Sequence, residues 1–343
     1  YGILVTRGEM TPFETSTYLA QVRRLRDLAE VAVREFPVRV RRLEFVQHGE
    51  NSVFKVTGAR DEKFLLRVHR LDYHTLDGIQ EELKWLDFLS ERIDADVPKP
   101  IRTKDGRRLV TVATNGIPQA RPVTMCRWVE GRFIHGQVRP KHMKELGRLI
   151  ANVQAVSSKI DVKHRRYWNA ESMLGPDPKW GEFDALPKVR QVTQGRIDEA
   201  RARMLKELKS FARKHPDRMN LIHSDMHFGN LLRNDRGWGV IDFDDCGFGF
   251  EAYDLNAPLM SVHFALKDVK RSKEFPAYRD ALIDGYTQIK SWDEDDAELL
   301  ENLMTVRYLI VLGWLNSRSD NPRLRSRLQA AVKRTIKHLD TVE

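Results

Sequence analysis

One stretch, residues 221–255, constrains the fold more than any other part of the chain. It reads LIHSDMHFGNLLRNDRGWGVIDFDDCGFGFEAYDL, an apolar pair followed by a polar loop and two short apolar runs. The runs, residues 231–232 and 238–243, flank Asn-Asp-Arg-Gly, which is typical of the turn of a β-hairpin. We therefore predict a loop that leads into a hairpin, and this hairpin carries Asn230 and Asp242 back to back.

The polar side chains of this stretch suit phosphoryl transfer. In that reaction the protein mainly positions groups, and it needs a carboxylate near the attacking hydroxyl and oxygen ligands for Mg²⁺. We predict that Asp225 is the catalytic carboxylate and that Asn230 and Asp242 are the metal ligands. The spacing His223-x-Asp225-x-x-x-x-Asn230 matches the catalytic loop of kinases, with Asp242 placed like the metal-binding aspartate of the following hairpin.

Two alternatives remain for the same residues. His223, Asp225 and His227 recur at two-residue intervals, and a mixture of histidine and carboxylate suits zinc or iron. In the other alternative the histidines are ordinary loop or core groups and the aspartates cap turns. That interpretation accounts for His227 or Asp245 singly but not for the whole set, because the aspartates have no obvious basic partner within the segment.

HSDMHFGN, followed by IDFDD and YDL, resembles the aminoglycoside phosphotransferase and choline kinase family. This family consists of small-molecule relatives of the protein kinases and includes type II homoserine kinases and a bacterial stress-response serine/threonine kinase. The resemblance is most specific between His223 and Asp254. It implies a protein-kinase-like fold, ATP and Mg²⁺ as cofactors, and transfer of the γ-phosphoryl group to a hydroxyl. We expect Asp254 to brace the backbone of the catalytic loop.

A cation in the third predicted strand is the candidate for binding phosphate. Arg67 stands among apolar residues where kinases usually have lysine, and a guanidinium can hold phosphate with two hydrogen bonds. An edge-strand arginine facing water is the alternative. A helix predicted over residues 75–92 carries Glu82 beside its apolar face, and the resemblance aligns QEELKWL so that Glu82, rather than Glu81, pairs with Arg67.

Two further segments contact the nucleotide by resemblance. Residues 49–52 join two predicted strands, and a tight turn of this kind can lay backbone N–H groups over phosphates. Residues 127–129 end a predicted hairpin, and the resemblance makes them an interlobe hinge whose backbone binds adenine. The predicted cofactor-binding residues are Gly49, Asn51, Ser52, Arg67, Glu82, Arg127 and Val129.

Composition bounds the class of protein. A chain of 343 residues with 41% hydrophobic content can bury a large core, and its length fits about two domains. No apolar run approaches the roughly 20 residues of a membrane span, and residues 1–10 lack the pattern of a signal peptide. Only Cys126 and Cys246 are present, which suits a reducing compartment. We expect a cytoplasmic protein without a membrane partner.

The formal net charge of +9 raises the question of nucleic-acid binding, because clustered Lys and Arg attract phosphate backbones. Basic clusters occur at residues 39–42, 163–166 and 323–334. None is interleaved with aromatic residues as in single-strand binders, and no DNA-binding motif is present. We therefore expect solvated helix faces and no nucleic-acid partner.

The predicted fold class is α+β, bilobal and protein-kinase-like, with a mainly β N-terminal lobe and a helical C-terminal lobe. We expect an N-terminal helical extension over residues 1–40, with a helix from residue 12 to 33 and Thr11 as its N-cap. Residues 41–129 form the nucleotide-binding lobe, and residues 130–343 form the catalytic and substrate-binding lobe. Within the latter, residues 163–187 are predicted to be irregular, either a substrate-facing insertion or a packed loop, and residues 247–250 to be flexible.

The predicted activity is ATP-dependent phosphoryl transfer to a small molecule, such as an amino alcohol, a homoserine-like molecule or an aminoglycoside. Asp244, Asp245 and Glu251 would favour a cationic acceptor, unless they serve the metal or the fold. A protein serine/threonine acceptor and a catalytically silent nucleotide-binding module are the alternatives. The expected assembly is a monomer or a homodimer.

Overall fold

The computed structural model describes residues 12–49, 51–134, 138–266, 273–319 and 322–342. Contacts between residues divide it into two compact units. The first comprises the described residues up to Glu91, Asp96–Glu130 and Val162–His164. The second comprises Arg92–Ala95, the described residues of Gly131–Asp161, and those from Arg165 onward.

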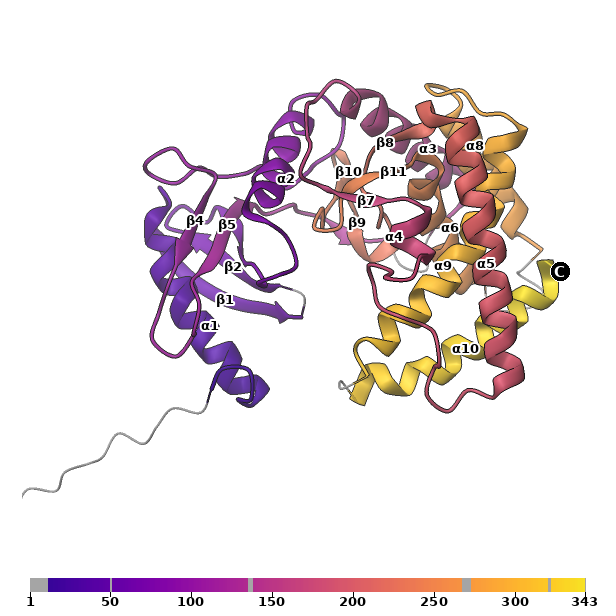
Figure 1. Ribbon diagram of the computed structural model, residues 1–343. Helices are drawn as coiled ribbons and strands as arrows, with labels where there is room; N and C mark the ends of the chain where they lie inside the picture. Colours follow the sequence, from indigo (N-terminus) through magenta and orange to yellow (C-terminus); the bar gives the residue numbers. More distant parts are fainter. Residues whose placement is uncertain (1–11, 50, 135–137, 267–272, 320–321, 343) are drawn as a thin grey trace, which may run out of the picture. The chain divides into compact units, whose positions relative to one another are not determined.

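The first unit is built on a five-stranded antiparallel sheet with the strand order β1-β2-β3-β5-β4 (Figure 1). Alternation along β3 directs Phe64, Leu66 and Val68 into a core shared with one helix, and directs Arg67 to the opposite face. The strands are β1 (Val40–His48), β2 (Ser52–Gly58), β3 (Lys63–Val68), β4 (Leu109–Val112) and β5 (Arg121–Arg127), and the helices are α1 (Tyr18–Ala32), η1 (Val33–Glu35) and α2 (Leu76–Leu89).

Helix α1 begins later than the sequence pattern predicted. It starts at Tyr18 because Thr17 caps it, and the Thr17 Oγ accepts a hydrogen bond from the Ala20 N–H at 3.3 Å. Thr11, the predicted N-cap, lies outside the described residues. Helix α1 supplies buried residues to the core of the sheet, so it packs as part of the first unit.

The second unit is mainly helical, and α9 is its central helix, in contact with α5, α6 and α10 (Figure 1). No helix in the described ranges is long and apolar enough to cross a membrane. The helices are α3 (Pro140–Ser157), α4 (Ala170–Leu174), α5 (Gln191–Lys214), η2 (Pro216–Arg218), η3 (Phe228–Asn230), α6 (Glu251–Ala265), α8 (Phe275–Tyr286), α9 (Glu294–Asn316) and α10 (Pro322–Val342).

The second unit also contains two small three-stranded sheets. One has the order β10-β9-β6 and contains the predicted hairpin, and the other has the order β7-β11-β8. Their strands are β6 (Arg132–Phe133), β7 (Arg166–Trp168), β8 (Met219–Ile222), β9 (Leu231–Asn234), β10 (Gly237–Val240) and β11 (Gly247–Phe250).

The second small sheet corrects two predictions. Residues 247–250, predicted to be flexible, form the central strand β11, because Gly247 pairs with both Ile222 and Arg166. Part of the segment predicted to be irregular, residues 163–187, forms β7 and α4. The parallel pairing of β7 with β11 joins residues about 80 positions apart, a contact that local sequence patterns do not reveal.

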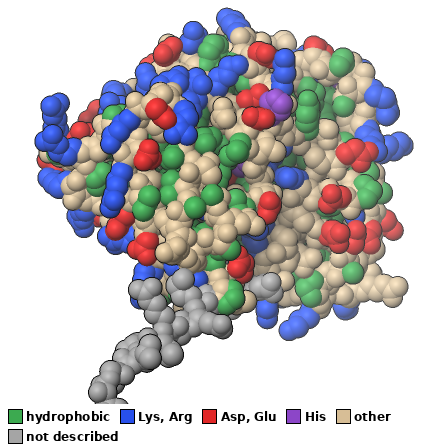
Figure 2. All heavy atoms as spheres, turned by 60° about the vertical axis from the view of Figure 1, so that its left-hand side comes forward, with side chains coloured by type: hydrophobic (Ala, Val, Ile, Leu, Met, Phe, Trp, Pro, Cys, Tyr) green, Lys and Arg blue, Asp and Glu red, His purple; other side chains and the backbone are tan. Residues whose placement is uncertain are grey.

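Charged side chains are spread over the face shown in Figure 2, with Asp and Glu among the Lys and Arg side chains. Exposed ion pairs such as that of Lys63 with Glu130, at 2.7 Å, neutralise part of the basic charge locally. The absence of a nucleic-acid partner stays a prediction.

Two glycines allow α3 and α8 to approach each other closely. A Cβ atom on Gly147 would lie 1.9 Å from the Leu282 carbonyl oxygen, and one on Gly285 would lie 1.9 Å from the Lys144 carbonyl oxygen. We expect Gly147→Ala to lower the free energy of unfolding by about 1–3 kcal/mol, measured by denaturant unfolding, since the helices must separate.

Gly195 in α5 is the matched control, because a Cβ atom there meets no heavy atom within 4 Å among the described residues. Gly195→Ala should stabilise the protein by about 0.5–1 kcal/mol, since alanine is the better helix former. Equal stability of Gly147→Ala and the unmodified protein would contradict the close helix contact.

Candidate active site

The loop after β8 is held by one buried carboxylate, that of Asp254 in the first turn of α6. Its Oδ2 accepts a hydrogen bond from the His223 N–H at 3.1 Å, and its Oδ1 accepts one from the Ser224 N–H at 2.6 Å. Burial raises the pKa of Asp254 above its ordinary value, although these hydrogen bonds oppose the shift. The expected bracing of the catalytic loop by Asp254 is confirmed.

Asp225 and Asn230 are brought into direct contact. The Asn230 Nδ2 donates to the Asp225 carbonyl oxygen at 2.9 Å and lies 3.4 Å from the Asp225 Oδ2. Because the amide nitrogen is directed at Asp225, the amide oxygen of Asn230 is directed elsewhere. Asn230 is thus oriented with its potential metal-binding atom away from the candidate catalytic carboxylate.

Asp242 follows β10, in the left-handed backbone region with φ 64°, and its side chain is exposed. The preceding residue, Ile241, donates its N–H to the Asn230 carbonyl oxygen at 3.0 Å. This hydrogen bond ties the returning arm of the hairpin to Asn230. The two predicted metal ligands therefore belong to neighbouring parts of one hairpin, and both offer the oxygen atoms that Mg²⁺ prefers.

Arg307 is a site residue that sequence reasoning missed. It lies on α9 and forms an ion pair with the Asp225 Oδ1, and its Nη1 donates to the Ser224 carbonyl oxygen at 3.2 Å. Burial alone would raise the pKa of Asp225, but Arg307 and then His227 outweigh it and hold that pKa below its usual range. A signal was present in the sequence, because Arg307 is a single cation within the apolar run of residues 306–310.

The two histidines of the loop have fixed tautomers that argue against a transition-metal site. The His223 Nδ1 accepts from the Asp225 N–H at 3.2 Å, so its Nε2 carries the proton, 3.1 Å from the Ile241 carbonyl oxygen. The His227 Nδ1 accepts from the Gly229 N–H at 2.8 Å, and its Nε2 lies 3.5 Å from the Asp225 Oδ2.

Both ring nitrogens of His223 are thus engaged within the protein. In the described part of the chain no group of three or more His, Cys, Asp or Glu side chains has the geometry of a metal site. The zinc or iron alternative for His223, Asp225 and His227 is therefore wrong.

The acidic residues after the hairpin have basic partners from distant segments. The Asp245 carboxylate pairs with Arg166 at 2.8 Å, and the Glu251 carboxylate pairs with Lys290 at 2.6 Å. The Asp244 carbonyl oxygen accepts a hydrogen bond from Arg165. Asp245 and Glu251 thus form part of the internal ion pairing of the second unit.

In the first unit, the predicted pairing of Arg67 with Glu82 is confirmed. Their side chains meet at 2.8 Å, and the two residues are only 9% and 2% exposed, so the carboxylate holds the guanidinium in a buried position. Glu81 points elsewhere, since its carboxylate accepts hydrogen bonds from the main-chain N–H groups of Lys163 and His164. The predicted helix register is therefore correct.

The turn between β1 and β2 is organised by its own hydrogen bonds. The Gly49 N–H donates to the Asn51 carbonyl oxygen at 3.1 Å, and the Asn51 Oδ1 accepts from the Arg70 N–H at 3.0 Å. Ser52 is buried, with its Oγ 2.8 Å from the His48 Nδ1. The Ser52 side chain therefore supports the turn, and the nucleotide-binding role of these residues stays a prediction.

The predicted adenine-binding backbone, residues 127–129, is partly engaged within the first unit. The Arg127 N–H donates to the Lys99 carbonyl oxygen at 2.8 Å, and the Trp128 N–H donates to the Lys63 carbonyl oxygen at 3.0 Å. Val129 is buried at the end of this segment. Of the two predicted residues, Val129 is therefore the stronger candidate to donate a backbone hydrogen bond to adenine.

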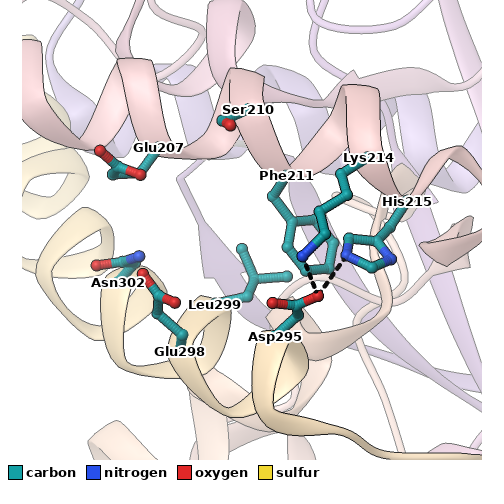
Figure 3. A pocket seen from close by; sticks show the side chains of 9 residues that line it. All are labelled: Glu207, Ser210, Phe211, Lys214, His215, Asp295, Glu298, Leu299 and Asn302. Atoms are coloured by element: carbon teal, nitrogen blue, oxygen red, sulfur yellow. Dashed lines mark hydrogen bonds and ion pairs between the residues drawn. The ribbon is translucent and has the colours of Figure 1, made fainter.

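A hollow of about 150 Å³ lies between the end of α5 and the start of α9 (Figure 3). Within it, Lys214 and His215 both contact the Asp295 carboxylate, at 2.6 and 2.9 Å. Asp295 and Arg307 are separated by 307 − 295 = 12 residues of α9, or about 18 Å along the helix axis. This hollow is therefore distinct from the surroundings of Asp225.

The sequence of residues 42–300, which is most of the chain, matches the family described as "Phosphotransferase enzyme family". The chain belongs to this phosphotransferase family. An uncharacterized protein of Synechocystis sp. is 24% identical over 252 residues, which cover 71% of this chain and 64% of that relative's length.

Two solved structures are similar over nearly the whole chain. A microcompartment-associated aminopropanol kinase has 28% identity and a TM-score of 0.76, covering 92% of this chain and 98% of that one. An amicoumacin kinase in complex with AMP-PNP, Ca²⁺ and Ami has 17% identity and a TM-score of 0.76, covering 92% and 94%. The predicted family, enzyme class and kinase-like α+β fold are confirmed, and the predicted cofactors, ATP and Mg²⁺, agree with the nucleotide analogue and divalent cation of the latter complex.

The ion pair of Arg67 and Glu82 generates a prediction with a built-in control. Glu82→Gln keeps the shape of the side chain but removes its charge, so Arg67 is held less firmly. We expect the KM for ATP to rise about five- to tenfold in steady-state kinetics, corresponding to roughly 1 kcal/mol.

Glu81→Gln is the matched control on the adjacent position of α2. It alters contacts with Lys163 and His164 and should leave the KM for ATP unchanged. The opposite result, a raised KM in Glu81→Gln and a normal one in Glu82→Gln, would show that the wrong glutamate supports nucleotide binding.

Proposed function

We propose that this chain transfers the γ-phosphoryl group of ATP to the hydroxyl of a small amino alcohol. The family assignment supports phosphoryl transfer. The observation that carries the assignment of residues is the contact of Asp225 with Asn230, in which a candidate catalytic carboxylate and a candidate metal ligand share one short loop.

In the proposed reaction the acceptor oxygen forms a bond to the γ-phosphorus, the bond from that phosphorus to the bridging oxygen breaks, and ADP leaves. The carboxylate of Asp225 accepts the hydrogen bond, and finally the proton, of the acceptor hydroxyl. Arg307 and Asn230 both contact this carboxylate and hold it in one orientation. Its main task is therefore to orient the hydroxyl, which suits a loose transition state in which the nucleophile bears little charge.

Asn230 and Asp242 are the residues that would hold Mg²⁺. When bound, this ion neutralises the charge of the phosphate oxygens. An amide oxygen with a carboxylate fits a hard cation, and Mg²⁺ usually completes its coordination with phosphate and water oxygens. The orientation of the Asn230 amide supports this role, since its nitrogen is directed at Asp225.

The first unit would bind the rest of the nucleotide. Arg67 would contact phosphate oxygens while Glu82 holds the guanidinium in place. The backbone of residues 49–52 would cover the phosphates, and Val129 would meet adenine. The burial of the ion pair supports this assignment. Removing two charges from water costs free energy, so a buried pair is weak evidence for stability and is better explained by a role such as binding phosphate.

The amino-alcohol acceptor rests on the similarity to the aminopropanol kinase, of which this chain covers 98%. A protein serine or threonine acceptor remains the alternative within the same chemistry. A silent nucleotide-binding module is disfavoured, because such a module has no need of Asp225, Asn230 and Asp242 together.

Replacing each carboxylate by asparagine separates the two proposed roles. Asp225→Asn should leave the MgATP-induced rise in Tm nearly unchanged while turnover falls about 10²- to 10⁴-fold, since the acceptor hydroxyl loses its carboxylate and neither proposed metal ligand is replaced. Asp242→Asn should lose turnover and the Mg²⁺-dependent part of the Tm rise, because Mg²⁺ binds a neutral amide more weakly. At about 100 times its Kd, MgATP adds roughly 2.7 kcal/mol, which is easily measured.

Asp235→Asn is the control, because Asp235 is exposed in the turn of the same hairpin. Its turnover and Tm rise should match those of the unmodified protein. The roles are wrongly assigned if MgATP binding requires Asp225 and tolerates the loss of Asp242.

The acceptor class is tested by ATP consumption with aminopropanol, ethanolamine, an aminoglycoside and a generic protein substrate. We expect acceptor-dependent ADP release with the amino alcohols, confirmed by mass spectrometry of the phosphorylated product. Phosphorylation of the protein substrate alone would overturn the small-molecule assignment while leaving the phosphoryl-transfer chemistry intact.

A further inference from the structure

Arg307 occupies an unusual position for a cation. It lies in the interior of α9 between the buried residues Val306 and Tyr308, and only 8% of its surface is exposed. Taking a guanidinium out of water costs several kcal/mol unless its donors and charge are matched. The contacts of Arg307 therefore indicate what the protein gains from it.

Three acceptors surround the guanidinium. Its Nη1 donates to the Ser224 carbonyl oxygen at 3.2 Å and to the Tyr253 Oη at 3.1 Å, and its Nη2 donates to the Asp225 Oδ1. Ser224 has a left-handed backbone with φ 69°, a conformation that a serine keeps only when its surroundings impose it. Arg307 thus binds both the carbonyl oxygen of Ser224, whose backbone is strained, and the carboxylate of the next residue, Asp225.

Two aromatic rings fix the guanidinium itself. The ring centres of Trp180 and Tyr253 lie 5.5 and 5.7 Å from its central carbon, within range of cation–π attraction. Trp180 belongs to the segment of residues 163–187, whose role the sequence left undecided. That segment therefore helps to hold the arginine.

The carboxylate of Asp225 consequently has two different sides. Its Oδ1 meets the buried Arg307, whereas its Oδ2 lies 3.4 Å from the Asn230 Nδ2 and 3.5 Å from the Nε2 of the partly exposed His227. The Asp225 side chain is 22% exposed. An acceptor hydroxyl can therefore reach this carboxylate from the Oδ2 side.

We infer that Arg307 is a positioning residue for phosphoryl transfer, which fixes the Asp225 carboxylate so that Oδ2 receives the acceptor hydroxyl. The inference rests on the proposed function, in which Asp225 orients that hydroxyl. Arg307 acts through Asp225: within the described residues its hydrogen bonds go to Ser224, Tyr253 and Asp225, and none goes to the proposed metal ligand Asp242.

The first test is Arg307→Met, which removes the charge and the donors but retains an unbranched side chain. With aminopropanol as acceptor, kcat should fall about 10²-fold, the loss expected from a misplacement of about 1 Å, while the KM for ATP stays within about twofold. Arg307→Lys should recover part of kcat, since it keeps the charge but not the fork of donors.

Arg218→Met is the matched control. Arg218 also has a poorly exposed side chain, and it pairs with Asp293 at 3.0 Å and Asp296 at 3.2 Å at the start of the same helix. Its replacement should lower Tm and leave kcat unchanged. A loss of kcat in Arg218→Met equal to that in Arg307→Met would reduce the role of Arg307 to general stability.

The decisive measurement is the double variant with Asp225→Asn and Arg307→Met. If Arg307 acts through Asp225, the kcat of the double variant should equal that of Asp225→Asn alone. A kcat lowered by the product of the two single-variant losses would overturn the inference. Full turnover in Asp225→Asn would instead refute the proposed role of Asp225. A normal kcat in Arg307→Met would refute the positioning role of Arg307 and leave the proposed role of Asp225 intact. If Arg307→Met does not fold, a normal kcat in Arg307→Lys would refute the positioning role instead.

Discussion

The loop after β8, which contains the proposed catalytic carboxylate, depends on Asp254, a carboxylate that is fully buried. Asp254 accepts the N–H groups of His223 and Ser224, and so imposes the left-handed backbone at Ser224. Gln154 of α3 lies 3.5 Å from the same carboxylate, and the Tyr286 hydroxyl of α8 donates to Gln154 at 2.7 Å. The loop geometry is therefore set by three helices packed together, and a change in their packing would reach the active site through this chain of hydrogen bonds.

Other carboxylates of residues 221–255 pair with basic side chains that lie far away in the sequence. Asp225 and Arg307 are 82 residues apart, Asp245 and Arg166 are 79 apart, and Glu251 and Lys290 are 39 apart. Carboxylates concentrated in one short stretch repel one another until such partners arrive. The stretch 221–255 thus contains the chemistry, but it needs the surrounding helices to hold that chemistry in place.

This division explains what could be predicted from the sequence. The hairpin follows from its apolar runs and local turn residues, so it was predicted correctly. The pairing of Arg67 with Glu82 was also predicted correctly, but it came from the family resemblance, because the helical period only places Glu82 beside the apolar face of α2. The parallel pairing of β7 with β11 and the partner of Asp225 join segments that no local pattern connects. The start of α1 was misplaced, since the apolar pattern gave no sign of the cap at Thr17.

Arg307, which the sequence analysis missed, also bears on the role proposed for the Asp225 carboxylate. An aspartate that acts by removing a proton early would benefit from a raised pKa, yet Arg307 lowers the pKa of Asp225. A loose phosphoryl-transfer transition state places little demand on the basicity of the nucleophile's partner, whereas it depends strongly on alignment. The ion pair with Arg307 lowers the basicity of Asp225 and fixes its orientation, which agrees with the proposed role, in which this carboxylate aligns the acceptor hydroxyl rather than ionises it.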